Sequence, residues 1–128
     1  MTLLPHVPAT RSEAIGQLRD ALTGSLLAPG DPSYDEVRRA GPTPWPSPVV
    51  IVLATGTDDI VQAVRFARSQ HVSVAVRSSG QRAGAAADGA VLIDTSRIDR
   101  VVVDLDCHTA VVGAGATWAR VVAETDRH

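Results

Sequence analysis

A strand–helix–strand pattern in the middle of the chain constrains the fold more than any other feature. Residues 49–53 are apolar and almost all β-branched, which is typical of a strand buried on both faces. Thr57 can cap a following helix whose first turn contains Asp58 and Asp59, where the helix dipole favours carboxylates. A second strand is predicted over residues 72–76. Strands joined through a helix in this way prefer parallel pairing with a right-handed crossover, so a sheet with flanking helices is expected.

Weaker signals predict the elements around this unit. The apolar stripe of the middle helix is expected on four residues at helical spacing, Ile60, Val61, Val64 and Ala67. Residues 1–25 are expected to form an N-terminal helical lead, with a helix capped by Ser12 and stopped by Gly24. A short helical piece is predicted over residues 31–39. The four prolines within residues 41–48 exclude a helix interior or a central strand there, and predict an extended connector.

The C-terminal third is expected to contain short strands and a helix. A strand over residues 90–93 is followed by Asp94 and Ser96, which are expected to cap the turn after it. Residues 101–104 and 109–112 predict a β-hairpin. A closing helix is predicted to begin after Thr117 and to carry Trp118 as a packing residue.

Composition excludes several classes of protein. The chain has 128 residues and a formal net charge of −2, which fits one domain and argues against a strongly basic nucleic-acid or membrane-surface binder. The single cysteine, Cys107, excludes an intrachain disulfide framework, and the four histidines lack metal-ligand spacing, so no metal site is predicted. No apolar run reaches the ~20 residues that span a bilayer, and no signal-peptide pattern begins the chain, so a cytoplasmic location is expected.

The segment of greatest chemical interest follows the second strand of the central unit. It reads Arg77-Ser78-Ser79-Gly80-Gln81-Arg82-Ala83-Gly84 and combines small side chains with two flanking arginines. Backbone N–H groups in such a loop can form a concave nest for an anion, and open sheets place ligands at the C-terminal ends of their strands. A phosphate or pyrophosphate group is the expected ligand. The alternative is a surface loop without a ligand, because a glycine-rich loop alone is a weak indication.

A second glycine-containing loop has the same position relative to its neighbours. Residues 113–117 read Gly-Ala-Gly-Ala-Thr, follow a predicted strand and open a helix, so the helix N-terminus is a second potential anion site. The alternative is a simple turn with Thr117 as a helix cap. Neither loop has the residues of a Walker motif or the glycine spacing of a Rossmann fingerprint.

Five segments form a linked pattern along the chain: Pro29–Arg39, Asp58–His71, Val74–Gly84, Asp88–Arg97 and Val111–Trp118. In this order and spacing, over about residues 26–125, they resemble FAD-linked oxidases of the berberine-bridge-enzyme and 6-hydroxynicotine-oxidase type. These enzymes belong to the vanillyl-alcohol-oxidase superfamily, whose flavin domain is called PCMH-type. The resemblance is to the N-terminal part of that domain.

The resemblance implies a fold and a cofactor. The expected fold class is α+β, a PCMH-type FAD-binding subdomain over residues 26–128, with a small βαβ-containing sheet and flanking helices, incomplete relative to the family. FAD is the implied cofactor, with its pyrophosphate held by backbone N–H groups. The residues that match cofactor-binding positions are Arg77, Ser78, Ser79, Gly80, Gln81, Arg82, Gly84, Gly115 and Thr117. No catalytic residue is assigned, because nothing in the chain resembles the family's substrate domain.

Two positions depart from the family pattern. Many members have a histidine at the position of Gln81, and that histidine is attached covalently to the flavin 8α-methyl group. An amide nitrogen, whose lone pair is delocalised into the carbonyl group, cannot form this bond, so FAD is expected to be bound non-covalently. At the next position, where serine is usual, Arg82 either pairs with a phosphate oxygen or blocks the pocket by its bulk.

The family pattern also implies further polypeptide. In complete relatives the remainder of the flavin domain and the whole substrate domain lie beyond the position of His128. We therefore expect the FAD-binding portion of a flavin-dependent oxidoreductase, without autonomous turnover. Two alternatives stay open. One is a non-catalytic truncated remnant, and the other is a half-module that needs a separately encoded C-terminal half.

Overall fold

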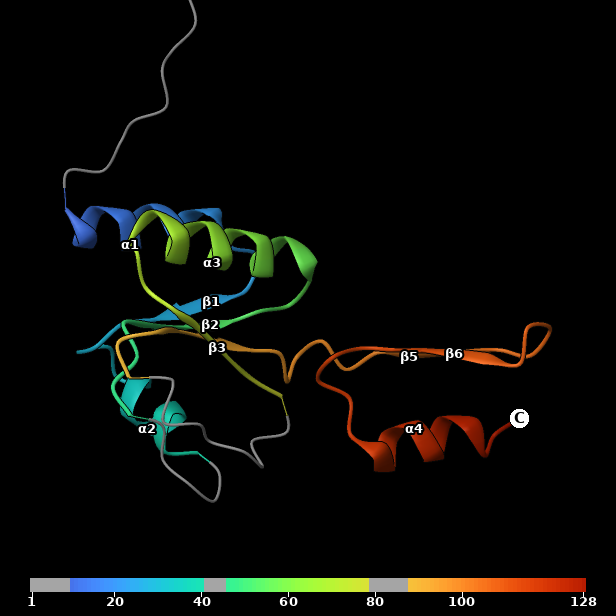
Figure 1. Cartoon of the computed structure of the whole chain (residues 1–128). Helices are drawn as coiled ribbons and strands as arrows, with labels where there is room; N and C mark the ends of the chain where they lie inside the picture. Colours follow the sequence, from blue (N-terminus) through green and yellow to red (C-terminus); the bar gives the residue numbers. More distant parts are fainter. Residues whose placement is uncertain (1–9, 41–45, 79–87) are drawn as a thin grey trace, which may run out of the picture.

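The computed structural model describes residues 10–40, 46–78 and 88–128 and confirms the α+β class (Figure 1). Its elements, in chain order, are α1 (Arg11–Ala21), β1 (Ser25–Leu27), α2 (Tyr34–Arg39), β2 (Val50–Leu53), α3 (Thr57–Ser69), β3 (Val74–Arg77), β4 (Val91–Asp94), β5 (Val101–Asp104), β6 (Thr109–Val112) and α4 (Trp118–Thr125). In the described part of the chain, no helix is both long enough and apolar enough to cross a membrane.

A four-stranded mixed sheet with the order β1-β2-β4-β3 forms the centre of the fold. Strands β2, β4 and β3 are parallel, and β1 is antiparallel to β2. The predicted strand–helix–strand unit is thus parallel, but β4 lies between its two strands. All four residues of β4 are buried, whereas Val74 and Val76 of β3 are exposed, so the more apolar strand lies inside and β3 forms an edge.

The sheet buries apolar side chains on both faces. One face packs under α1 and α3, through Val50, Val52, Val91 and Ile93 of the central strands. The opposite face packs against α2, where Tyr34 contacts Ile51 and Leu92. The Tyr34 hydroxyl is buried with its ring and donates a hydrogen bond of 2.7 Å to the Pro48 carbonyl oxygen.

The buried face of α3 matches the predicted stripe at Ala67 and at the partly buried Ile60, but not at its other two positions. Ala63, Phe66 and Ala67 are buried, whereas Val61 and Val64 are exposed. The reason is Asp59, which is 2% exposed and shares a helix face with Ala63. Its carboxylate must face the protein to reach its hydrogen-bond donors, and this sets the rotation of the helix. Thr57 is the first helical residue rather than the cap, a position held by Gly56.

The N-terminal region contains two further differences. The cap of α1 is Thr10 rather than Ser12, because the Thr10 side chain accepts a hydrogen bond from the Glu13 N–H. Strand β1 was not expected, since three residues carry no readable alternation of polarity. Helix α1 contributes Ala14 and Leu18 to the same core as the sheet, and β1 spans the position at which we expected the N-terminal lead to end.

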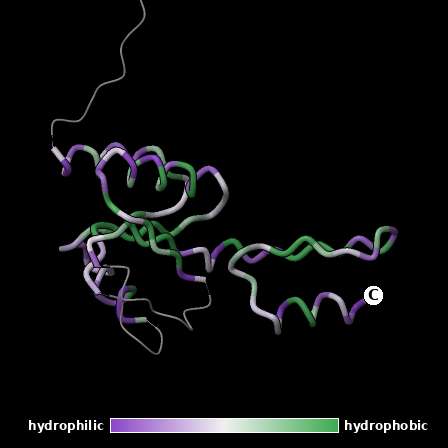
Figure 2. Tube along the Cα trace, in the orientation of Figure 1, coloured by the Kyte–Doolittle hydropathy of each residue, from purple (hydrophilic) through white to green (hydrophobic). Residues whose placement is uncertain are grey.

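Strands β5 and β6 form the predicted antiparallel hairpin, and it extends away from the main sheet together with α4 (Figure 1). The hairpin is largely hydrophobic along its length (Figure 2). Its apolar side chains are nevertheless accessible, and Val111 is 73% exposed. Helix α4 lies next to β5 but has no buried residue, and Trp118 is 82% exposed rather than packed as expected.

Candidate functional site

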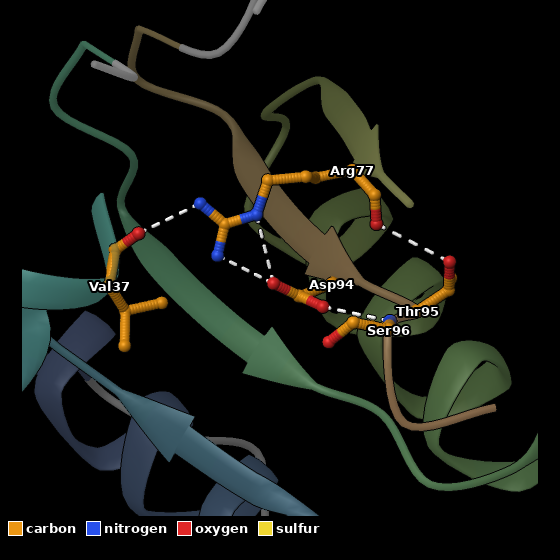
Figure 3. Close-up of polar contacts among 5 residues, drawn as sticks. All are labelled: Val37, Arg77, Asp94, Thr95 and Ser96. Carbon is orange, nitrogen blue, oxygen red and sulfur yellow. Dashed lines mark hydrogen bonds and ion pairs between the residues drawn. The ribbon is translucent and has the colours of Figure 1, made fainter. Parts of the chain in front are cut away.

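The C-terminal ends of β3 and β4 carry a buried ion pair on the α2 face of the sheet (Figure 3). Arg77 and Asp94 are register partners and the last residues of their strands. The Asp94 Oδ2 atom accepts hydrogen bonds from Arg77 Nε at 2.9 Å and from Arg77 Nη2 at 2.5 Å. Both side chains are only 6% exposed. This edge is where open parallel sheets bind their ligands.

The Arg77 side chain has a second partner besides Asp94. Its remaining nitrogen, Nη1, donates to the Val37 carbonyl oxygen of α2 at 2.8 Å, so the guanidinium is turned into the protein. The sequence predicts that Arg77 flanks the glycine-rich loop with positive charge. This charge is neutralised by Asp94, which the strand order places directly opposite it. No pattern within one strand could reveal this partner.

The turn after β4 is fixed by the same two residues. Asp94 Oδ1 accepts the Ser96 N–H at 2.9 Å, so Asp94 caps this turn as predicted. The Arg77 carbonyl oxygen accepts the Thr95 N–H at 2.9 Å and the Thr95 hydroxyl at 3.3 Å. Main chain and side chains thus join the two strand ends at this point.

The structure brings the two glycine-containing segments into contact. The Ser78 hydroxyl donates a hydrogen bond of 2.5 Å to the Ala114 carbonyl oxygen, across 36 positions in the sequence. The start of the first segment and the middle of the second therefore meet beside the ends of β3 and β4. The remaining residues of the first segment that we singled out, Ser79, Gly80, Gln81, Arg82 and Gly84, lie outside the described residues.

The second segment has a packing role that the sequence did not reveal. The Gly115 N–H donates to the Ile98 carbonyl oxygen at 2.8 Å. A Cβ atom at Gly115 would overlap the Thr95 carbonyl oxygen and lie 2.7 Å from its carbon, so only glycine fits. The Thr117 side chain accepts from the Arg120 N–H at 3.3 Å and caps α4. These contacts match the alternative of a turn with a threonine cap, and a role in cofactor binding stays a prediction.

Asp59 is a second buried carboxylate, at the start of α3. It accepts N–H hydrogen bonds from Thr23 at 2.8 Å, Gly24 at 2.9 Å and Thr55 at 2.9 Å, and a hydroxyl bond from Thr55 at 3.0 Å. Burial raises the pKa of the Asp59 carboxyl, but the hydrogen bonds lower it by more, so the net shift is downward. A small cavity lies beside it, lined in part by Gly56 and Asp59 itself. Asp59 thus ties the start of α3 to the segment before β1, whereas the expectation for the acidic pair was limited to the first turn of the helix.

Within the described ranges, no cluster of histidine, cysteine, aspartate or glutamate side chains could hold a metal ion.

Comparison with known proteins identifies the class to which this fold and site belong. Residues 48–128 match the family described as FAD binding domain, which is more than half of the chain. The chain therefore belongs to the PCMH-type FAD-binding domains of FAD-linked oxidoreductases.

Individual relatives agree with this assignment. The FAD-linked oxidoreductase pgmH of Aspergillus terreus is 30% identical over 114 residues, which cover 84% of this chain and 23% of the relative. The uncharacterized FAD-linked oxidoreductase YvdP of Bacillus subtilis is 31% identical over 98 residues, or 73% of this chain and 22% of the relative.

Solved structures show the same fold. The 6-hydroxy-D-nicotine oxidase of Arthrobacter nicotinovorans superposes with a TM-score of 0.74 at 23% identity, over 83% of this chain and 24% of that one. A xylooligosaccharide oxidase of Myceliophthora thermophila gives a TM-score of 0.74 at 22% identity, over 90% of this chain and 25% of that one. The chain thus spans about a quarter of the length of its relatives.

Proposed function

We propose that this chain holds the pyrophosphate of FAD non-covalently at the C-terminal edge of its parallel strands. The observation that carries the proposal is the Ser78–Ala114 hydrogen bond, which joins the two glycine-containing segments at that edge. Membership of the FAD-binding family supports FAD as the ligand. Backbone N–H groups in the segment after Ser78, together with Gly115 and Thr117 in the second segment, are the groups that the family resemblance assigns to the cofactor.

The charges at this edge are compatible with a diphosphate. Asp94, the carboxylate at the end of β4, is neutralised by Arg77. Asp99, in the turn that follows, is paired with Arg120 at 2.6 Å. Neither carboxylate presents an unbalanced negative charge to an incoming anion, so backbone N–H dipoles can attract the phosphate oxygens.

The bound cofactor would supply the redox chemistry, because a flavin ring accepts a hydride and passes its electrons to an acceptor. The protein part supplies position and electrostatics. We propose that the complete protein is a flavin-dependent oxidoreductase. The contribution of this chain is to bind and orient the cofactor.

A titration of free FAD tests the binding proposal. We expect FAD fluorescence to be quenched by the wild-type chain, and Gly80→Val to abolish the quenching because a side chain would keep the loop backbone away from the phosphates. Gly16→Ala is the control, since a Cβ atom at Gly16 in α1 meets nothing within 4 Å. Equal affinities of the wild type and Gly80→Val would contradict the proposed nest.

Denaturation tests the mode of attachment. Because Gln81 has no nucleophilic imidazole nitrogen, we expect all flavin to separate from the polypeptide after the FAD complex is precipitated with acid. The measurement is flavin absorbance in the supernatant and flavin fluorescence of the protein band on a denaturing gel. Fluorescence that stays with the band would refute the non-covalent mode.

The exposed hairpin favours a second candidate, a half-module completed by a separately encoded chain. An isolated two-stranded hairpin is marginally stable in water, and here Val111 of the hairpin and Trp118 of the neighbouring helix α4 are accessible. In this case FAD affinity should rise when the unmatched remainder of the Bacillus subtilis relative is added as a separate polypeptide. A truncated remnant should bind no FAD with or without that addition. Binding that the addition leaves unchanged would favour an independent cofactor-binding unit.

A further inference from the structure

The buried Arg77–Asp94 ion pair is expected to add little net stability to the sheet. Burying two charges costs desolvation energy, and apolar residues of similar volume often replace such a pair without loss of stability. Both side chains are 6% exposed, so little solvent offsets that cost. The pair is therefore better explained by the geometry that it imposes than by the stability that it adds.

Every charged atom of the pair has a directional partner. Arg77 uses Nε and Nη2 on Asp94 and Nη1 on the carbonyl oxygen of Val37, which ties the end of β3 to α2. Asp94 uses its second oxygen on the Ser96 N–H, which fixes the turn after β4. Figure 3 shows the guanidinium between the Val37 carbonyl and the Asp94 carboxylate, with the turn leaving from the far side.

The second glycine-containing segment packs against this turn. The Thr95 main chain lies directly against Gly115, and the Ile98 carbonyl oxygen accepts the Gly115 N–H. Ser78, the residue after Arg77, binds the same segment at Ala114. A contiguous set of contacts thus leads from the ion pair to Ser78 and to the 113–117 segment.

We infer that Arg77 and Asp94 are positioning residues, which set the direction of the main chain at Ser78 and in the Thr95–Ile98 turn and thereby hold Ser78 and the 113–117 segment in a fixed arrangement at the edge proposed for the cofactor. The cofactor part of this inference rests on the proposed function. The alignment part concerns the protein alone. Arg77 thus acts through its neighbours rather than as a direct phosphate ligand.

The test uses a double variant, Arg77→Met with Asp94→Leu, which removes both charges and keeps a comparable volume. The matched control is Glu124→Leu with Arg127→Met, which removes an ion pair of 3.1 Å between the end of α4 and the residues after it, with side chains 30% and 69% exposed. Arg77→Lys is a third variant, because it keeps the charge and loses the two-point contact with Asp94. Amide hydrogen exchange and FAD titration are measured on each protein.

In the double variant we expect the Thr95 and Gly115 amides to exchange at least about tenfold faster, while the amides of β2 keep their protection. FAD affinity should fall by about tenfold or more, as is common when a supporting contact of a binding site is lost. Arg77→Lys should give a smaller change of the same sign, and the control pair should change neither quantity.

Unchanged exchange at Thr95 and Gly115 in both Arg77 variants would overturn the inference, as would faster exchange that is uniform across the whole sheet. If the wild-type chain binds no FAD, the proposed function fails, and the exchange measurement still decides whether the pair aligns the two segments. If the wild type binds FAD and the double variant binds it equally well, the positioning role is refuted while the proposed function stands.

Discussion

Replacing Asp59 with alanine is expected to lower the free energy of unfolding by about 4 kcal/mol, because it leaves buried N–H groups without an acceptor. The carboxylate accepts the N–H groups of Thr23, Gly24 and Thr55, and it joins the start of α3 to the segment before β1. The Asp59 side chain is 2% exposed, so its hydrogen bonds lie largely away from solvent. Urea unfolding followed by circular dichroism measures the change.

Asp58→Ala is the matched control for this prediction. Asp58 is the neighbouring carboxylate in the first turn of α3, but its side chain is exposed. Its contribution to stability is therefore limited to its interaction with the helix dipole. Its replacement should cost less than about 1 kcal/mol. Equal losses for the two variants would show that Asp59 acts only through the helix dipole and would contradict the role assigned to its hydrogen bonds.

The same carboxylate predicts a dependence of stability on pH. The pKa of Asp59 is lower in the folded state than in the unfolded state, so the unfolded chain binds a proton more readily at acidic pH. The stabilisation is complete above the unfolded pKa of about 4 and is lost as the pH falls through the folded pKa. Asp59→Asn should therefore reduce the loss of stability between neutral and acidic pH. A variant with the wild-type slope would refute the assignment.

Local patterns were enough to predict the strands after β1 but not their order. The β-branched run in β2, the apolar run in β4 and the two short valine-rich runs of the hairpin are local features of the sequence, and these elements lie where we expected them. The insertion of β4 between β2 and β3 depends on the relative burial of whole strands, which no short window contains. The rotation of α3 was missed for a related reason, because a buried aspartate in its first turn overrides the apolar stripe.

In the candidate site, too, local patterns predicted the segments, whereas contacts that depend on strand order could not be predicted. Sequence reasoning identified the two glycine-containing segments, and the structure brings them together through Ser78 and Ala114. The partner of Arg77 could not be predicted, because Asp94 becomes its neighbour only through the strand order. We expected Asp94 to cap its turn, which it does with one oxygen, but the pattern gave no sign that the other oxygen holds an arginine.

Gly115→Ala distinguishes a glycine kept for packing from one kept for a ligand. We expect it to destabilise the chain by about 3 kcal/mol, because the new Cβ atom would overlap the Thr95 carbonyl group and lie 2.8 Å from the Cα atom of Ser96. Backbone atoms cannot rotate away, so the segment has to move and its hydrogen bond to Ile98 is strained or lost. Urea unfolding in the absence of FAD is the decisive measurement, since a glycine that serves only a ligand would leave the free protein unaffected.

Gly16→Ala provides the contrast within the same chain. Gly16 lies inside α1 with open space around its Cα atom, so alanine should stabilise the protein by about 0.5–1 kcal/mol through its higher helix propensity. The two substitutions add the same methyl group and are expected to act in opposite directions. An unchanged urea midpoint for Gly115→Ala would mean that the 113–117 segment is not held against the Thr95–Ile98 turn. The contacts of Arg77 and Asp94 would then reach the Thr95–Ile98 turn but not the 113–117 segment. The hydrogen bond from Ser78 to Ala114 would be the remaining contact between the two glycine-containing segments.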